Sequence, residues 1–129
     1  MQSKVYKAVI IEDDADVRFM YKLKLEAAGY EVAIAGNGVE GLEVIEQTKP
    51  DIVLLDLMMP VMGGAEMLAK LRTHAWASDM RVIILTNISK DEAPQALRFL
   101  SVDRYIVKAH HTPGQVVAIT DEVLGKKSP

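Results

Sequence analysis

Short uninterrupted apolar runs alternate along this chain with longer segments in which apolar residues recur every three or four positions. The apolar runs predict five strands, at about 5–11, 30–35, 51–56, 81–86 and 104–107. Their continuous apolar character, clearest in the third and fourth runs, is typical of parallel strands that are buried on both faces. The periodic segments between the runs predict helices. The pattern therefore predicts an α/β domain with (βα)5 organisation, in which helices cover both faces of an open parallel sheet.

Polar residues mark where the helices begin. Three pairs have the spacing of a capping box, namely Asn37 with Glu40, Ser89 with Glu92, and Thr112 with Gln115. The pair at Ser89 predicts a helix between the fourth and fifth strands, with Pro94 shifting its expected start toward Asp91. Two further helices are expected, one from about Asp14 to Gly29 and one after Gly64.

Four of the predicted strands end in side chains that can do chemistry. These are Glu12 and Asp13 after the first strand, Asp56 at the third, Thr86 at the fourth and Lys108 after the fifth. The carboxyl ends of parallel strands meet at one edge of the sheet, where the ligand sites of open α/β folds lie. Asp56 is the most informative of these residues, because an ionised carboxylate is costly to bury and this one interrupts the apolar run 52–59.

This set of side chains suits phosphoryl transfer. Three carboxylates crowded into one pocket repel one another, and they would either hold a proton or bind a cation. Oxygen ligands suit Mg²⁺ or Mn²⁺, whereas zinc is disfavoured because the chain has no cysteine. Asp56 could act as a nucleophile toward phosphorus, Lys108 could pair with the phosphoryl group, and Thr86 could donate a hydrogen bond to it.

Each of these residues also has an ordinary structural interpretation. The ordinary roles would be a helix cap for Asp13 or Asp14, a common strand-end residue for Thr86 and a solvated surface lysine for Lys108. His110 and His111 invite a metal or phosphotransfer role, but adjacent histidines rarely point the same way, and we expect a solvated loop there. The functional interpretation is preferred because four separate strand ends must agree to produce the pattern.

Length and composition limit the classes of protein. With 129 residues the chain is expected to be one domain, 1–129, with its core at about 5–125. Its 18 acidic and 15 basic residues give a net charge of −3, which argues against direct nucleic-acid binding because that needs a basic face. No apolar run approaches the ~18 residues of a membrane span, and the N-terminal residues lack the apolar core of a signal peptide. We therefore expect a cytoplasmic protein that does not enter a membrane.

At these strand-end residues the chain closely resembles the receiver domains of bacterial two-component response regulators, over about residues 5–125. Asp56, within the segment 54–64, matches the phosphoacceptor and its loop. The other matches are the metal-binding acid pair (Glu12, Asp13), the switch hydroxyl (Thr86), the aromatic switch residue (Tyr105) and the invariant lysine (Lys108). The spacings between these residues also match the family, which makes the whole set highly specific.

The resemblance implies a fold and a reaction. The fold is the flavodoxin-like doubly wound sheet with strand order 2-1-3-4-5. A histidine kinase or a histidine phosphotransfer protein would donate a phosphoryl group to Asp56. Mg²⁺, or Mn²⁺, would be bound by Asp13, Asp56 and the backbone carbonyl of Met58, and Glu12 would act through a metal-bound water. The family also catalyses the loss of its own phosphoryl group, so no other enzymatic activity is expected.

The resemblance also implies a conformational switch. Thr86 would move toward the phosphoryl group, and Tyr105 would turn inward into the vacated space. This change would repack the face formed by the helix after Ser89, the strand 104–107 and the helix after Thr112. The repacked face would control a partner protein or an output domain, and it could also carry a homodimer.

Particular residues at four positions modify these expectations. Proline usually follows the lysine in this family, whereas Ala109 favours a trans Lys108–Ala109 bond, since a non-proline cis bond costs about 3–4 kcal/mol. Asn87 replaces the usual small residue after the threonine, and we expect it to weaken phosphorylation by small donors. Met58 and Ile88 occupy positions that tune hydrolysis and offer no group to orient water. They predict a phosphoryl group that lasts minutes or longer.

Other classes of protein fit the sequence less well. A pseudo-receiver, which binds proteins without taking phosphate, would not need the intact set of acids, threonine and lysine. An aspartyl-phosphate phosphatase of the haloacid dehalogenase type needs a second aspartate two residues after the nucleophile, where Met58 stands. A flavodoxin-like electron carrier needs a glycine- and hydroxyl-rich phosphate loop after the first strand, and the acidic segment 12–14 would repel a flavin phosphate.

Overall fold

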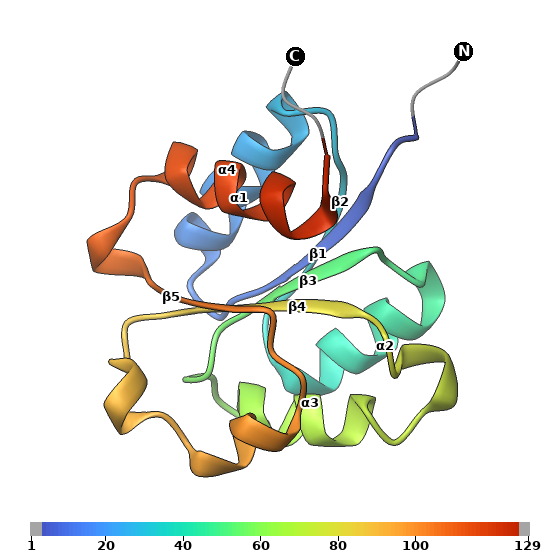
Figure 1. The fold of residues 1–129 in the computed structure, drawn as a ribbon, viewed down its shortest axis with the longest axis vertical. Helices are drawn as coiled ribbons and strands as arrows, with labels where there is room; N and C mark the ends of the chain where they lie inside the picture. Colours follow the sequence, from blue (N-terminus) through green and yellow to red (C-terminus); the bar gives the residue numbers. More distant parts are fainter. Residues whose placement is uncertain (1–3, 127–129) are drawn as a thin grey trace.

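The computed structural model of the protein describes residues 4–126, and its centre is one parallel sheet of five strands (Figure 1). The strands are β1 (Lys7–Ile11), β2 (Glu31–Ala35), β3 (Ile52–Leu55), β4 (Arg81–Thr86) and β5 (Arg104–Val107). Their order in the sheet is β2-β1-β3-β4-β5. The five predicted strands, their parallel pairing and the predicted order are therefore confirmed.

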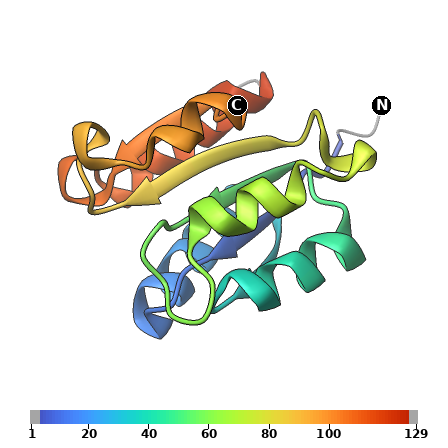
Figure 2. The same cartoon turned by 90° about the horizontal axis from the view of Figure 1, so that it is seen from below.

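Four α-helices cover the two faces of the sheet. They are α1 (Ala15–Ala27), α2 (Gly38–Thr48), α3 (Gly64–Leu71) and α4 (Pro113–Leu124). The helices α1 and α4 lie on one face, and α2 and α3 lie on the other (Figure 1). Figure 2 views the molecule from the side that α2 and α3 cover. The arrangement is the doubly wound α/β fold that the hydrophobic pattern predicts.

The two layers of core follow the alternation of side chains along the strands. On β1, Ala8 and Ile10 pack on the side of α1 and α4, whereas Val9 and Ile11 pack on the side of α2 and α3. All four side chains are buried, because a central strand of a covered sheet has no solvent-facing side. The uninterrupted apolar runs in the sequence are the direct consequence.

Three helices begin at the predicted polar residues. Asp14 caps α1 by accepting hydrogen bonds from the backbone N–H groups of Asp16 and Val17. The Asn37 side chain accepts from the Glu40 N–H at 2.9 Å, and Thr112 forms a reciprocal capping box with Gln115. These caps satisfy N–H groups that have no partner inside the helix.

The prediction of a helix after Ser89 is wrong. The connection between β4 and β5 forms two short 3-10 helices, η2 (Lys90–Glu92) and η3 (Gln95–Phe99), and the Ser89 side chain makes no capping bond. Ala93 between them is extended, with ψ of 150°, because the ring of Pro94 disfavours the helical conformation in the residue before it. Two further 3-10 turns are η1 (Ala75–Ala77) and η4 (Lys108–His110).

Candidate functional site

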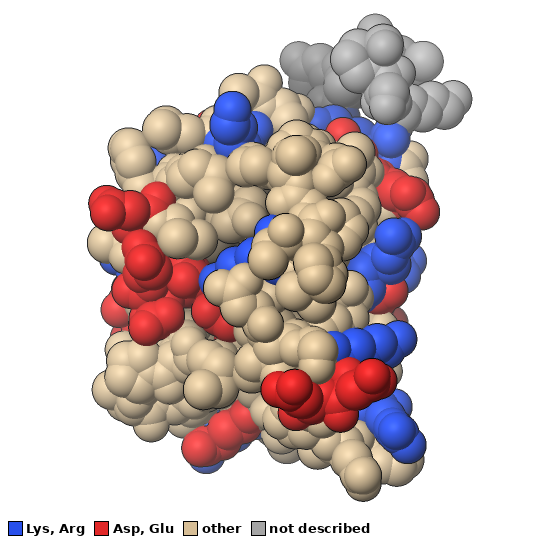
Figure 3. Space-filling model, turned by 90° about the vertical axis from the view of Figure 1, so that its left-hand side faces the viewer, with Lys and Arg blue, Asp and Glu red and all other residues tan. Residues whose placement is uncertain are grey.

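The polar residues that follow the strands meet at one end of the sheet. Glu12 directly follows β1, Asp56 directly follows β3, Thr86 ends β4 and Lys108 directly follows β5. The register pairs Ile11 with Leu55, Leu55 with Ile84 and Thr86 with Val107, so the four strands end close to the same level. Figure 3 views this end of the molecule and shows acidic side chains gathered on it.

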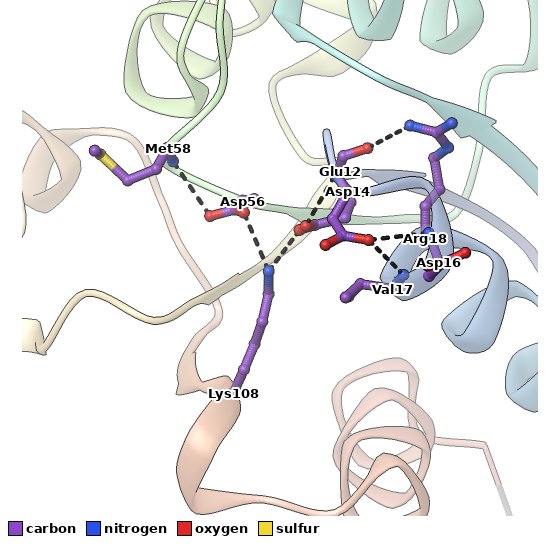
Figure 4. A network of polar contacts seen from close by, with 8 residues as sticks. All are labelled: Glu12, Asp14, Asp16, Val17, Arg18, Asp56, Met58 and Lys108. Carbon is purple, nitrogen blue, oxygen red and sulfur yellow. Dashed lines mark hydrogen bonds and ion pairs between the residues drawn. The ribbon is translucent and has the colours of Figure 1, made fainter.

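Lys108 lies between two buried carboxylates (Figure 4). Its Nζ is 2.5 Å from Glu12 Oε2 and 3.1 Å from Asp56 Oδ2. Only 5% of Glu12 and 6% of Asp56 is exposed, so these ion pairs are shielded from water. Asp56 Oδ1 accepts a hydrogen bond from the backbone N–H of Met58 at 3.2 Å, which orients the carboxylate.

The pKa values of the two carboxylates are shifted in opposite directions. Burial, and after it the neighbouring Asp56, raise the pKa of Glu12 to about 7, against the lowering effect of Lys108. Burial also acts to raise the pKa of Asp56, but its contact with Glu12, the nearby Thr86 hydroxyl and the charge of Lys108 outweigh this and lower that pKa overall. Below about pH 7 the metal-free site therefore holds a proton on Glu12 and leaves Asp56 ionised.

The site also has the ligands for a hard cation. One carboxylate oxygen each from Glu12, Asp13 and Asp56 can be chosen so that all three lie within 4.8 Å of one another. Glu12 and Asp56 are buried, whereas Asp13 is exposed, so the group combines two shielded oxygens with one that faces solvent. Oxygen donors that leave positions open to water are the set that Mg²⁺ prefers, and these residues fit that ion.

Thr86 offers a hydroxyl that has no partner. Its side chain is fully buried at the end of β4, and Thr86 Oγ1 is the one buried side-chain polar atom without a hydrogen bond in the described part of the chain. A buried hydroxyl without a partner costs free energy, and such a cost is expected where a ligand group is to be bound. Tyr105 on the neighbouring β5 donates its hydroxyl hydrogen to the Ile88 carbonyl at 2.7 Å.

Comparison with known proteins places the chain in a family. Residues 8–120 match the family model described as the response regulator receiver domain. The chain belongs to this family. As a receiver domain, it is also similar to the phosphate regulon transcriptional regulatory protein PhoB of Pseudomonas aeruginosa, with 36% identity over 123 residues, 94% of this chain and 52% of that protein.

The similarity extends to other regulators and to solved structures. The response regulator MprA of a Mycobacterium species is 36% identical over 80 residues, which cover 62% of this receiver domain and 34% of that protein. The chemotaxis response regulator CheY4 of Vibrio cholerae superposes with a TM-score of 0.85 at 26% identity, over 93% of this chain and 99% of that one. A putative response regulator from Chloroflexus aurantiacus gives 0.85 at 28% identity, over 95% and 99% of the chains.

The receiver domain spans about a third to a half of the length of these curated relatives, from 34% of MprA to 52% of PhoB. None of the helices within residues 4–126 is long and apolar enough to cross a membrane.

Lys108 lies in the site even though residues near it differ from the family pattern. The Lys108–Ala109 peptide bond is trans, as expected, and Lys108 nevertheless reaches both carboxylates. Asn87 is exposed beside Thr86, and Ile88 packs against the core. His110 is exposed on η4, and neither it nor His111 belongs to the group of possible metal ligands within residues 4–126.

Two residues near the site were missed by the sequence interpretation. Arg18 donates a hydrogen bond to the backbone carbonyl of Glu12 at 2.8 Å (Figure 4). Gly64, the first residue of α3, packs against the backbone of Asp56. One weak indication for Arg18 was present in the sequence. It stands four residues after the helix cap Asp14, so it lies one helical turn from the cap, on the same side of α1. Gly64 carried no signal beyond the expected start of a helix.

Proposed function

We propose that this receiver domain accepts a phosphoryl group on Asp56 from a histidine kinase or a histidine phosphotransfer protein, in a reaction that needs Mg²⁺ or Mn²⁺. The observation that carries the proposal is the buried Asp56 carboxylate, held ionised beside Lys108 and the acid pair. An ionised carboxylate in a shielded site is an available nucleophile. Reaction with a phosphohistidine would form the O–P bond on Asp56 and break the P–N bond of the donor.

Each residue of the site has a role in this reaction. Asp13, Asp56 and the backbone carbonyl of Met58 would hold the metal ion, with Glu12 acting through a water molecule. The bound ion would neutralise charge on the transferred phosphoryl group. Lys108 would stay paired with the new phosphoryl oxygens. The unpartnered hydroxyl of Thr86 would donate a hydrogen bond to one of them.

Phosphorylation would then act as a switch. Movement of Thr86 toward the phosphoryl group would free space for Tyr105, which now bonds to the Ile88 carbonyl. The affected face consists of η2, η3, β5 and α4, since no α-helix lies between β4 and β5. This face would bind a downstream protein, an output domain or a second copy of the chain. Direct contact with nucleic acid is not proposed for these residues.

Residues 1–129 would form a single receiver domain that acts by signalling, with no reaction beyond its own phosphorylation and dephosphorylation. Histidine kinases present their phosphoryl groups in the cytoplasm, and we therefore propose that this protein also acts there.

Mass spectrometry of the intact protein tests the reaction on Asp56. We expect incubation with a phosphorylated histidine kinase or acetyl phosphate to add one phosphoryl mass, only when Mg²⁺ is present. The Asp56→Asn variant removes the nucleophile and should gain no mass. Since a histidine kinase can be specific for its partner, kinases from several systems are tried alongside acetyl phosphate. Folded wild-type protein that gains no mass from any donor would instead support a pseudo-receiver that only binds proteins.

Asn87→Ala tests the expected restriction of small donors. Asn87 is exposed next to Thr86, and shortening it should open the approach to Asp56. We expect faster uptake from acetyl phosphate in the variant, measured as the rate of mass gain at fixed Mg²⁺.

The lifetime of the phosphoryl group is measured on wild-type samples from which the donor has been removed. It should be minutes or longer, because the side chains of Met58 and Ile88 cannot orient water. Unchanged uptake in Asn87→Ala, or a lifetime of seconds, would refute the respective expectation.

A further inference from the structure

Arg18 connects the first turn of α1 to the loop that carries the acid pair. Its backbone N–H donates to the Asp14 carbonyl at 2.9 Å, in the hydrogen-bond pattern of the helix. Its side chain turns back toward β1, and Nη1 donates to the Glu12 carbonyl at 2.8 Å (Figure 4). The Arg18 side chain is half-buried, so this charge-assisted hydrogen bond is partly shielded from water.

The peptide groups of Glu12 are held from two sides. The Glu12 N–H donates to the carbonyl of Ala35, the last residue of β2, at 3.0 Å. The Glu12 carbonyl accepts from Arg18, so the backbone on each side of the Glu12 Cα is fixed. Because the Glu12 carbonyl belongs to the peptide bond that leads into Asp13, its orientation sets the directions of both acidic side chains.

Gly36 makes room for the Arg18 side chain. A Cβ atom built on Gly36 would lie 3.1 Å from Arg18 Nη1 and 3.9 Å from its Cζ. Such a contact is tight, and the guanidinium, whose Nη1 is bonded to the Glu12 carbonyl, would have to shift by a few tenths of an ångström to relieve it. Arg18, Gly36 and Glu12 therefore form one contiguous contact between the β1–α1 and β2–α2 loops.

Arg18 differs from Lys108 in what it contacts. Lys108 pairs with the carboxylate oxygens themselves, so a divalent cation must share those oxygens with it. Arg18 donates to a backbone carbonyl and leaves the carboxylate oxygens free. A cation in this position can stabilise the acidic loop without competing for its ligand atoms.

We propose that Arg18 is a positioning residue of the divalent-cation site, which holds the Glu12–Asp13 peptide so that both carboxylates face the ion. The inference rests on the proposed function, because it presumes that the ion binds there. Groups that orient metal ligands commonly affect metal affinity by about 10- to 100-fold when they are removed. Arg18 acts through the backbone of the ligands, so the lower end of that range is expected.

Metal affinity in the unphosphorylated protein is the readout that tests this role. Mg²⁺ binding is measured by calorimetry, and Mn²⁺ binding by the electron paramagnetic resonance signal of the free ion. Arg18→Met is expected to weaken both by about tenfold. Arg18→Lys should recover part of the loss, because an ammonium can donate to the same carbonyl. Lys24→Met, which removes an exposed positive charge in the last turn of α1, is the matched control for net charge and should leave affinity unchanged.

A double-mutant cycle with Gly36→Ala separates positioning from a general loss of stability. The added methyl group should weaken metal binding in the wild-type background, because it displaces the guanidinium. It should have little further effect in Arg18→Met, where no guanidinium remains to displace. Additive effects of the two substitutions would overturn the inference, and so would wild-type affinity in Arg18→Met. A wild-type protein that binds neither ion would refute the proposed function as well, so the two failures are distinguishable.

Discussion

Gly64→Ala is expected to destabilise the protein by about 3 kcal/mol, at the upper end of the usual cost of overpacking a core. A Cβ atom at Gly64 would lie 3.0 Å from the backbone carbon of Asp56, 3.1 Å from Leu55 Cγ and closer still to the Asp56 carbonyl oxygen. Two of these three atoms are backbone atoms at the end of a central strand, so they cannot turn away as a flexible side chain can. To relieve this contact, either α3 or the Asp56 peptide must move.

The same substitution should impair the site. Asp56 directly follows β3, and Gly64 is the first residue of α3, so the start of this helix lies against the proposed phosphoacceptor. Movement of the Asp56 backbone would change the direction of its carboxylate relative to Lys108 and Asp13. We therefore expect weaker Mg²⁺ binding and slower phosphoryl uptake in Gly64→Ala, in addition to the lower free energy of unfolding measured by urea titration.

Gly114→Ala is the matched control for this prediction. Gly114 is exposed in the first turn of α4, and a Cβ atom there would meet only Thr112 Oγ1, at an ordinary 3.9 Å. Alanine is the better helix former, so this variant should gain about 0.5–1 kcal/mol. Equal stability in Gly64→Ala and Gly114→Ala would show that the close approach of α3 to Asp56 does not constrain the fold.

Lys108→Met is expected to lower the free energy of unfolding of the metal-free protein by about 3 kcal/mol at about pH 8. Lys108 is the shared cation of two carboxylates that are almost fully buried. Methionine keeps most of the length of the side chain but leaves both negative charges without their partner. A buried charge that loses its partner is costly because neither water nor protein compensates for it.

The loss should depend on pH. The folded-state pKa of Glu12 is raised from 4.5 to about 7, first by burial and then by Asp56. A raised pKa means that Glu12 contributes stability below its unfolded-state value, and that this contribution is lost as the pH rises through about 7. The contribution of Lys108 to the free energy of unfolding is therefore largest above that pH, where both carboxylates are ionised. At about pH 5.5 Glu12 is already neutral, and Lys108→Met should cost less than half as much.

Urea unfolding at both pH values, with Lys108→Arg as the variant that keeps the charge, measures this difference. Added Mg²⁺ should stabilise Lys108→Met more than it stabilises wild type at the higher pH, because the divalent ion replaces the missing positive charge. Phosphoryl uptake should still fall, since the variant lacks the ammonium that is proposed to pair with the phosphoryl oxygens. A stability loss that is the same at both pH values would contradict the assigned role of Lys108 as the counter-charge.

Much of the fold and of the candidate site could be predicted from the local sequence. A strand covered on both faces is apolar along its buried length, and this made the three inner strands, β1, β3 and β4, visible as continuous apolar runs. The edge strands β2 and β5 are only partly buried, but their apolar residues were still sufficient to predict them. Polar side chains that directly follow such strands must lie at the carboxyl edge of the sheet. For this reason Glu12, Asp56, Thr86 and Lys108 could be assigned to one site before any contact between them was known.

The segment after Ser89 shows where local signals were insufficient. The capping pair of Ser89 and Glu92 predicted an α-helix, but the segment forms two 3-10 turns separated by the extended residue before Pro94. Only Leu97 is buried in those turns, and Phe99 is 85% exposed. A helix is stabilised mainly by burying an apolar face, and this segment buries too little to overcome the conformational effect of the proline.

The sequence by itself determined the class of fold, the order of the elements along the chain and the residue types at the strand ends. Only the tertiary structure decided that Lys108 lies between Glu12, 96 residues away, and Asp56, 52 residues away. It also decided that Glu12 rather than Asp56 has the raised pKa, and that Arg18 turns back to the Glu12 carbonyl. The physical reason is that hydrophobic periodicity acts over a few neighbouring residues. Distances between charges and their shielding from water depend on the sheet register and on the helices packed over it.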